Sequence, residues 1–235
     1  MPIHVNPMPE HADSWKMIYL ARRNPRLAAE DFAQAWREHS ALGRQCRNVQ
    51  DRVRSVTQCV RLLDGHWPSD ADARYDGVNL LRLRDRESAD AIWSDPETLA
   101  IMRPDEPRVF DRYVRDCALV AREQPVHAGA AGDAVLVAFL KRRPAVADAD
   151  FAQALRLCAP GWAGSGRAVL NLVEPQRPAG YDYDAVVEWW FRDAAQMGTS
   201  LAGRPVSAAL PVLCQTVCDY RASVFMPTRV SHRRP

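Results

Sequence analysis

The chain has 235 residues, of which 47% are hydrophobic, and its 31 basic residues nearly balance 29 acidic ones for a formal net charge of +2. These values fit one large globular domain or two small ones, and the charge lacks the basic excess of a nucleic-acid-binding protein. No apolar run reaches the roughly 18 residues of a membrane span, and the first residues lack the pattern of a signal peptide. We therefore expect a cytoplasmic protein with no nucleic-acid or membrane partner.

The first half of the sequence alternates strand and helix patterns. Runs rich in β-forming residues predict strands, and apolar residues at three- and four-residue spacing predict helices. In chain order these are a strand over residues 15–21, a helix over about 28–46, strands over 52–62 and 75–83, a short helix near 88–93 and a strand over 110–120. The predicted order is βαββαβ.

The second half repeats the first. The motif DFAQA begins at Asp31 and again at Asp150, and a Tyr-Asp pair begins at Tyr75 and again at Tyr183. The predicted elements recur as a strand over residues 134–140, a helix over about 148–162, strands over 167–174 and 183–191, a short helix over 194–201 and a strand over 212–225. The sequence therefore predicts repeats over 13–122 and 133–227, with a linker rich in alanine and glycine over 123–132.

The βαββαβ order is that of the ferredoxin-like unit, in which two helices cover one face of a four-stranded antiparallel sheet. The other sheet face is apolar and needs a cover, which the second copy can supply. We therefore expect an α+β fold made of two tandem ferredoxin-like repeats packed sheet to sheet, as an intramolecular pseudo-dimer. A further homodimer stays open.

Short motifs in the first repeat follow the pattern of a known family. The opening strand ends in Arg-x-x-Pro, the first helix carries Phe32-x-x-x-Trp36-x-x-His39, and the third strand begins at Tyr75 with Tyr-Asp-Gly-Val. These motifs resemble the EthD-like group of the dimeric α+β barrel superfamily, over nearly the whole chain. The resemblance implies a barrel of two facing sheets with a small-molecule pocket between a sheet and its helices. The superfamily includes cofactor-free cyclases, isomerases and monooxygenases and also haem proteins, so it does not fix one reaction.

His39 is the main candidate for a catalytic residue. It falls on the apolar stripe of the first predicted helix with Phe32 and Trp36, where no other titratable side chain is expected to face the sheet. An imidazole titrates near pH 6.5 and can therefore donate and accept protons at neutral pH. The alternative is a core histidine bonded to a backbone carbonyl. The equivalent position in the second repeat is Cys158, so this group is expected in the first site only.

Strand positions near His39 supply the other predicted site residues. Tyr19 on the first strand is predicted to be a second catalytic residue that donates a hydrogen bond, with Trp15 and Met17 on the same strand face as apolar walls, and Trp36 is predicted to bind substrate. Asn79 and Arg82 on the third strand point to opposite faces, because successive strand residues alternate, so only one of them can face the pocket. Both stay candidates for substrate binding.

Two charged residues at strand ends are further candidates for substrate binding. Arg22 ends the first strand and could hold a substrate carboxylate, although a solvated strand end is the alternative. Asp76 starts the third strand and recurs as Asp184, which favours a structural carboxylate over a catalytic partner of His39.

Three other features have open interpretations. Glu188 could line a second pocket or pair with an arginine across the two repeats, and the segment 66–68 (His-Trp-Pro) could act as a lid. Cys214 and Cys218 fall in a predicted strand, which favours buried thiols over a shared metal ion.

The function predicted from these residues is cofactor-independent proton transfer. The substrate would be a small hydrophobic, aromatic carbonyl or carboxylate compound, and the reaction a lyase or isomerase type that includes decarboxylation or cyclisation. His39 would be the general acid or base, and Tyr19 would stabilise a developing enolate. No glycine-rich phosphate loop or serine-nucleophile elbow is visible, so no organic cofactor or metal is predicted. The alternatives are a haem-binding barrel, which Cys158 disfavours, and a non-catalytic small-molecule-binding protein.

Overall fold

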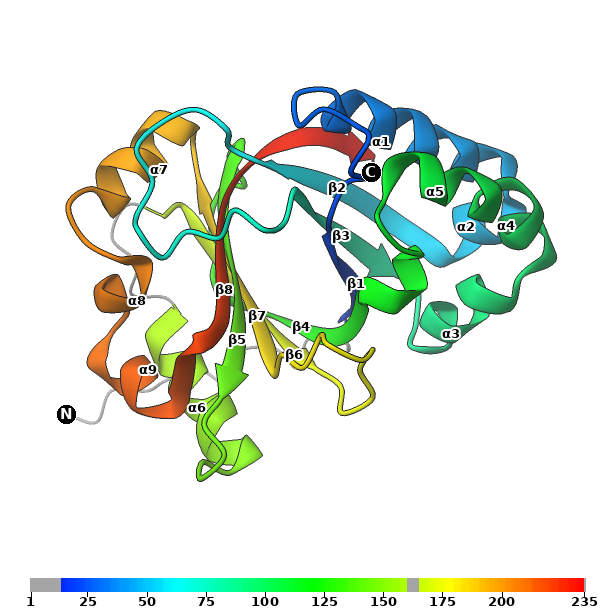
Figure 1. Ribbon diagram of the computed structural model, residues 1–235. Helices are drawn as coiled ribbons and strands as arrows, with labels where there is room; N and C mark the ends of the chain where they lie inside the picture. Colours follow the sequence, from blue (N-terminus) through cyan, green and yellow to red (C-terminus); the bar gives the residue numbers. More distant parts are fainter. Residues whose placement is uncertain (1–13, 160–164, 235) are drawn as a thin grey trace.

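The strands of the chain join into one closed antiparallel barrel (Figure 1), in a computed structural model that describes residues 14–159 and 165–234. Around the barrel, the strand order is β1-β3-β2-β8-β5-β7-β6-β4. The strands are β1 (Ser14–Ala21), β2 (Val53–Arg61), β3 (Gly77–Leu83), β4 (Ala118–His127), β5 (Ala134–Arg142), β6 (Arg167–Val173), β7 (Ala185–Phe191) and β8 (Cys218–Arg234).

The helices lie outside the barrel in two groups on opposite sides (Figure 1). The first group comprises α1 (Phe32–Leu42), η1 (Gly43–Gln45), α2 (Arg47–Arg52), α3 (Glu87–Ser94), α4 (Pro96–Ile101), η2 (Arg103–Asp105), α5 (Glu106–Val109) and η3 (Val114–Cys117). The second comprises α6 (Asp148–Cys158), α7 (Ala194–Leu201), α8 (Val206–Ala209) and α9 (Val212–Val217). None of the helices in the described ranges is long and apolar enough to cross a membrane.

The two halves of the chain contribute matching sets of strands. The first half is ordered β4-β1-β3-β2 and the second β8-β5-β7-β6, and the sets join where β2 pairs with β8 and β4 pairs with β6. The expected face-to-face sheets are therefore joined at both edges. Closure has a physical reason, because each unpaired edge would leave a row of backbone N–H and C=O groups without partners.

The end of each half differs from the sequence expectation. The strand expected over 110–120 begins only at Ala118, after α5 and η3, and β4 then occupies the first part of the predicted linker. Pro107 in the first turn of α5 favours a helix start there. In the second half, the segment 212–217 is α9, preceded by Pro211, and Cys214 lies in that helix rather than in a strand. Strand β8 runs to Arg234, beyond the predicted repeat boundary at 227.

The interior of the barrel holds a buried group of charges that connects the two halves. Lys16 of β1 lies 2.5 Å from Glu188 of β7 and 2.6 Å from Glu123 of β4, and all three side chains are at most 4% exposed. Glu123 also pairs with Arg82, while Glu188 accepts a hydrogen bond from Asn171 at 2.9 Å. Glu188 of the second half therefore forms an ion pair with the first half, as one interpretation of the sequence expected. Its partner is Lys16 and not an arginine.

Because both barrel seams run between the halves, neither half should be stable alone. Residues 14–127 expressed without the rest would expose the edges of β2 and β4, and Lys16 would lose Glu188. We expect this fragment to be insoluble or to self-associate, as measured by size-exclusion chromatography with light scattering. A soluble monomeric fragment with a cooperative thermal transition would show that the halves are independent.

Candidate active site

A cavity of about 60 Å³ lies between α1, the helices that follow β3 and the outer face of β1, β2 and β3. One water molecule needs roughly 10–15 Å³, so the cavity has room for a few heavy atoms or for one end of a larger molecule. Its lining residues are Tyr19, Trp36, His39, Ser40, Gly43, Val49, Val53, Val56, Gln58, Asn79, Leu81, Ile92, Trp93, Thr98, Met102, Glu106, Phe110, Val114 and Arg234.

His39 is held in place by a carboxylate from η2. Its Nδ1 atom lies 3.0 Å from Oδ2 of Asp105, and its ring meets Phe110 edge-on with 5.5 Å between centroids. Arg108 in turn donates to both carboxylate oxygens of Asp105, at 2.7 and 3.1 Å. Arg108, Asp105 and His39 therefore form a chain of contacts that runs from the surface to the buried imidazole.

The electrostatics favour a neutral His39 with its proton on Nδ1. Burial lowers the pKa of His39, and the hydrogen bond to Asp105 only partly offsets this effect. The hydrogen bonds from Arg108, together with that from His39, hold the pKa of Asp105 below its usual value. An ionised Asp105 accepts the Nδ1 proton, which leaves the Nε2 lone pair as the basic site. At neutral pH, the Nε2 atom of His39 is therefore unprotonated and can accept a proton.

Three polar side chains form a row across the sheet beneath α1. Tyr19, Asn79 and Gln58 are register partners on β1, β3 and β2, and all three line the cavity. The amide oxygens of Asn79 and Gln58 are buried and have no hydrogen-bond partner within the described residues. Burial is the main cause that raises the pKa of Tyr19, so its hydroxyl stays protonated. The row therefore offers an O–H donor and two amides to a bound molecule.

The structure decides between the two candidates on β3. Asn79 faces the cavity, whereas Arg82 points into the barrel and pairs with Glu123. Trp36 lines the cavity, and its ring fits because residue 77 is glycine: a Cβ there would lie 2.4 Å from the Trp36 ring.

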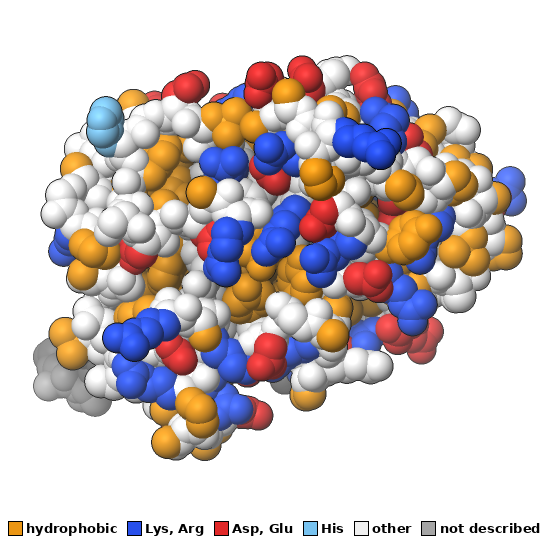
Figure 2. Space-filling view, in the orientation of Figure 1, with side chains coloured by type: hydrophobic (Ala, Val, Ile, Leu, Met, Phe, Trp, Pro, Cys, Tyr) orange, Lys and Arg blue, Asp and Glu red, His pale blue; other side chains and the backbone are white. Residues whose placement is uncertain are grey.

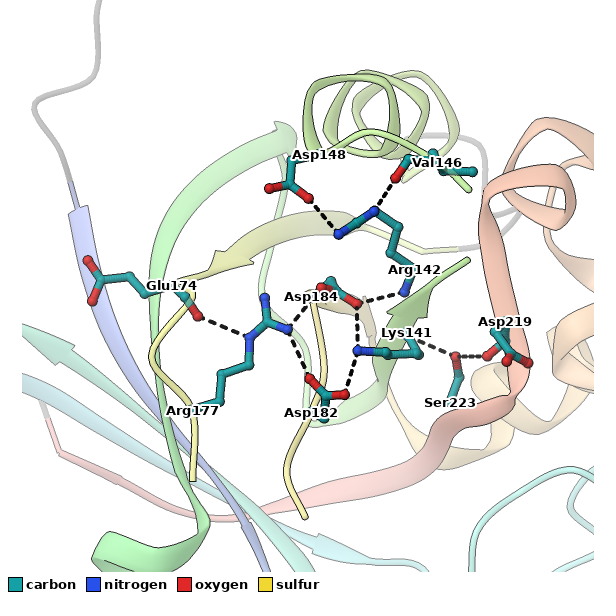
Figure 3. Close-up of polar contacts among 10 residues, drawn as sticks. All are labelled: Lys141, Arg142, Val146, Asp148, Glu174, Arg177, Asp182, Asp184, Asp219 and Ser223. Atoms are coloured by element: carbon teal, nitrogen blue, oxygen red, sulfur yellow. Dashed lines mark hydrogen bonds and ion pairs between the residues drawn. The ribbon is translucent and has the colours of Figure 1, made fainter. Parts of the chain in front are cut away.

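Asp76, at the start of β3, is not one of the residues that line the cavity around His39. Asp76 accepts a hydrogen bond from the Arg23 backbone at 2.9 Å and pairs with the Arg23 side chain. Asp184 accepts the equivalent bond from the Arg142 backbone at 2.8 Å and contacts Lys141 and Arg177 (Figure 3). This repeated arrangement matches the structural interpretation of Asp76.

Arg22 and the segment 66–68 are also separate from the cavity. The Arg22 guanidinium stacks 4.8 Å from the ring centre of Tyr75 and does not reach the residues that line the cavity. Trp67 packs on the hydrophobic core of the second half, and nearby Asp70 accepts hydrogen bonds from the start of α8. The lid interpretation is therefore not supported by the placement of this segment.

The second half does not share this polar lining at the matching positions. The positions equivalent to Tyr19, His39, Gln58 and Asn79 are Ala138, Cys158, Leu170 and Val187, all buried. Trp189 stands where the first half has Leu81, and its indole donates to the Ala159 carbonyl at 2.8 Å beside the end of α6.

The residues around Cys158 and the size of the cavity near His39 decide whether haem fits. In the second half, the position equivalent to His39 is Cys158, which is 3% exposed and belongs to the hydrophobic core that contains Phe151, Leu155 and Trp189. The cavity near His39 is far smaller than a porphyrin. Neither place fits haem, so no role for haem is assigned.

Sequence reasoning missed four residues that line or support the cavity: Asp105, Glu106, Gln58 and Arg234. Asp105 and Glu106 fall just outside a segment that was expected to be a strand, and Arg234 lies past the predicted boundary. Glu106 is 5% exposed and accepts a hydrogen bond from the Val114 backbone, and burial raises its pKa. Gln58 was open to prediction, because it alternates with Val56 and Val60 on β2 and therefore shares their buried face.

Comparisons with known proteins agree at the level of fold. No family model and no curated protein matches the sequence. Among solved structures, the chain is similar to an anthrone oxidase-like protein (TM-score 0.66, 10% identity, 96% of this chain and 94% of that one). It is also similar to two candidate monooxygenases: one from Fusobacterium nucleatum (0.57, 9%, 95% and 95%) and one from Lactobacillus acidophilus (0.53, 8%, 94% and 96%). These likenesses, at such low identity, establish that the chain has an α+β barrel fold.

Proposed function

We propose that this protein is an enzyme that removes a proton from a small carbonyl compound, with His39 as the general base. One observation carries the proposal. A neutral imidazole oriented by Asp105 shares a cavity with a row of three polar side chains, and every equivalent position of the second half is apolar. The amide oxygens of Asn79 and Gln58 are buried without a hydrogen-bond partner among the described residues, which costs stability and favours a functional reason for their presence in one half only.

The mechanism follows from the positions of these groups. His39 Nε2 accepts the proton from carbon next to the carbonyl, and Asp105 stabilises the resulting imidazolium. The Tyr19 hydroxyl and an amide N–H of Asn79 or Gln58 donate to the enolate oxygen as its charge develops. The apolar walls of Trp36 and Phe110 keep water away, which strengthens these interactions.

The fate of the enolate defines the reaction class. Reprotonation at another atom gives an isomerase, and expulsion of a leaving group gives a lyase. A second candidate is cofactor-free oxidation by dioxygen, in which a methylene carbon becomes a carbonyl and water is released. The likeness to an anthrone oxidase-like protein and to candidate monooxygenases favours this second candidate.

We also propose how the chain is divided into repeats. The matching strand orders of the two halves and the repeated Asp76 and Asp184 contacts support two tandem EthD-like repeats of ferredoxin-like topology. We place their boundaries at 13–122 and 133–227, with β8 continuing beyond the second boundary, and we expect a cytoplasmic location.

Solvent deuterium exchange tests the proposal for every fate of the enolate. A panel of aromatic ketones and keto acids is incubated with the protein in D2O, with and without dioxygen, and analysed by mass spectrometry. We expect enzyme-dependent deuterium uptake next to the carbonyl. Products that form only with dioxygen would select the oxidative candidate, and binding without exchange or turnover would identify a carrier instead.

The proposal also predicts the pH dependence of exchange. Because burial lowers the pKa of His39 from 6.5, the neutral base persists below pH 6.5, and the rate should decline only at lower pH. Asp105 raises this pKa, so Asp105→Asn should move the midpoint to still lower pH and also reduce the rate. Exchange rates are measured from about pH 4 to about pH 8, a range of roughly four units that includes the reference pKa of histidine. They check the midpoint of the unaltered protein and its shift in Asp105→Asn. A midpoint at or above 6.5 would contradict the assignment.

A further inference from the structure

The last strand of the second half brings an arginine into the cavity of the first half. Strand β8 ends beside α1 (Figure 1), and its Arg234 is the register partner of Val56 on β2. Both residues line the cavity that contains His39. The Nη2 atom of Arg234 is buried and has no hydrogen-bond partner within the described ranges. A guanidinium donor is therefore available to a bound molecule.

The charged groups that act on Arg234 and on nearby His232 are arginines, although Glu106 is among the residues that line the cavity. Burial lowers the pKa of Arg234, and the charge of Arg44 lowers it further. Burial also lowers the pKa of His232, with added effects from Arg37, Arg234 and Arg44. Within the described residues, none of these three arginines forms an ion pair with a carboxylate. Basic and acidic side chains are interspersed over the face shown in Figure 2.

We infer that Arg234 binds an anionic group of the substrate, so that the substrate class is a small carbonyl compound bearing a carboxylate. A guanidinium binds a planar carboxylate through two parallel N–H donors, and such charge-assisted pairs are stronger than neutral hydrogen bonds. A half-buried guanidinium without an acid gains most from an anion supplied by the ligand. The inference rests on the proposed function, in which His39 then acts on the carbonyl end of the anchored molecule.

Binding measurements test the inference separately from catalysis. Benzoate and propanoate, each compared with its neutral amide, are titrated by isothermal calorimetry. We expect each carboxylate to bind about ten- to a hundredfold more tightly than its amide, the range for a hydrogen bond to a charged group. Arg234→Met should abolish this preference, and Arg234→Lys should retain part of it.

Two control variants make the result specific. Arg233 precedes Arg234 but faces the other side of β8, where it pairs with Asp133, so Arg233→Met should retain the carboxylate preference. His39→Gln should also retain it while losing deuterium exchange. Equal affinity for acid and amide in the unaltered protein, or an unchanged preference in Arg234→Met, would overturn the inference. Loss of exchange activity with the preference intact would concern only the proposed function.

Discussion

Replacing His39 by glutamine should reduce enzyme-dependent deuterium exchange by at least about a hundredfold, the lower end of the range for general acid–base catalysis. Glutamine has a similar size and can still donate to Asp105, so the wall of the cavity should be preserved. It has no lone pair basic enough to accept a proton at neutral pH. The loss should therefore appear in the rate of proton removal and not in ligand affinity.

The second half supplies the matched control for this variant. Cys158 occupies the equivalent helix position and is 3% exposed, but its surroundings are apolar. Cys158→Ala should leave the exchange rate near that of the unaltered protein, provided that thermal unfolding shows a folded barrel. Exchange within a few fold of normal in His39→Gln would remove His39 from the mechanism.

Replacing Lys16 by methionine should lower the free energy of unfolding by about 3–5 kcal/mol, the usual cost of removing one partner from a buried ion pair. Burial alone would raise the pKa of Glu123, yet Lys16 and Arg82 hold it below the ordinary value. Without Lys16, the hydrogen-bond donors left to Glu188 among the described residues would be the neutral Asn171 and Trp190. Urea unfolding at neutral pH, followed by tryptophan fluorescence, measures the loss.

A double variant separates the lost charge from lost packing. Lys16→Met combined with Glu188→Gln removes both charges, so it should be more stable than Lys16→Met alone, because no unpaired carboxylate is left at this position. If the double variant were the less stable of the two, or if Lys16→Met changed the unfolding free energy only slightly, the ion pair would not connect the halves as described.

Much of the fold could be predicted, because the strand and helix patterns of the first half recur in the same order in the second half. The apolar runs of β1, β3, β5 and β7 lie in the predicted places, and α1 and α6 begin within a few residues of their expected starts. The ends of the halves could not be predicted in the same way. The segments before β4 and β8 contain β-forming residues, and the short helices there depend on prolines and on packing against the cavity and the second core.

The site residues could be predicted only where the periodicity of one helix or one strand identifies its buried face. The stripe of α1 located His39 and Trp36, and strand alternation located Tyr19 and one of two residues on β3. Asp105 and Arg234 could not be found, because no periodic pattern relates η2 or the end of β8 to α1. Asp105 contacts His39 from a segment more than sixty residues further along the first half, and Arg234 reaches the cavity through the pairing of β8 with β2.

The seams between β2 and β8 and between β4 and β6 also have an evolutionary consequence. In an assembly of two identical chains, a substitution in one copy is also present in the other, so both cavities must change together. Two halves within one chain are free of this constraint. Here the first half has the polar row and His39, whereas the second half has alanine, cysteine, leucine and valine at the matching positions and contributes its last strand to the cavity of the first half.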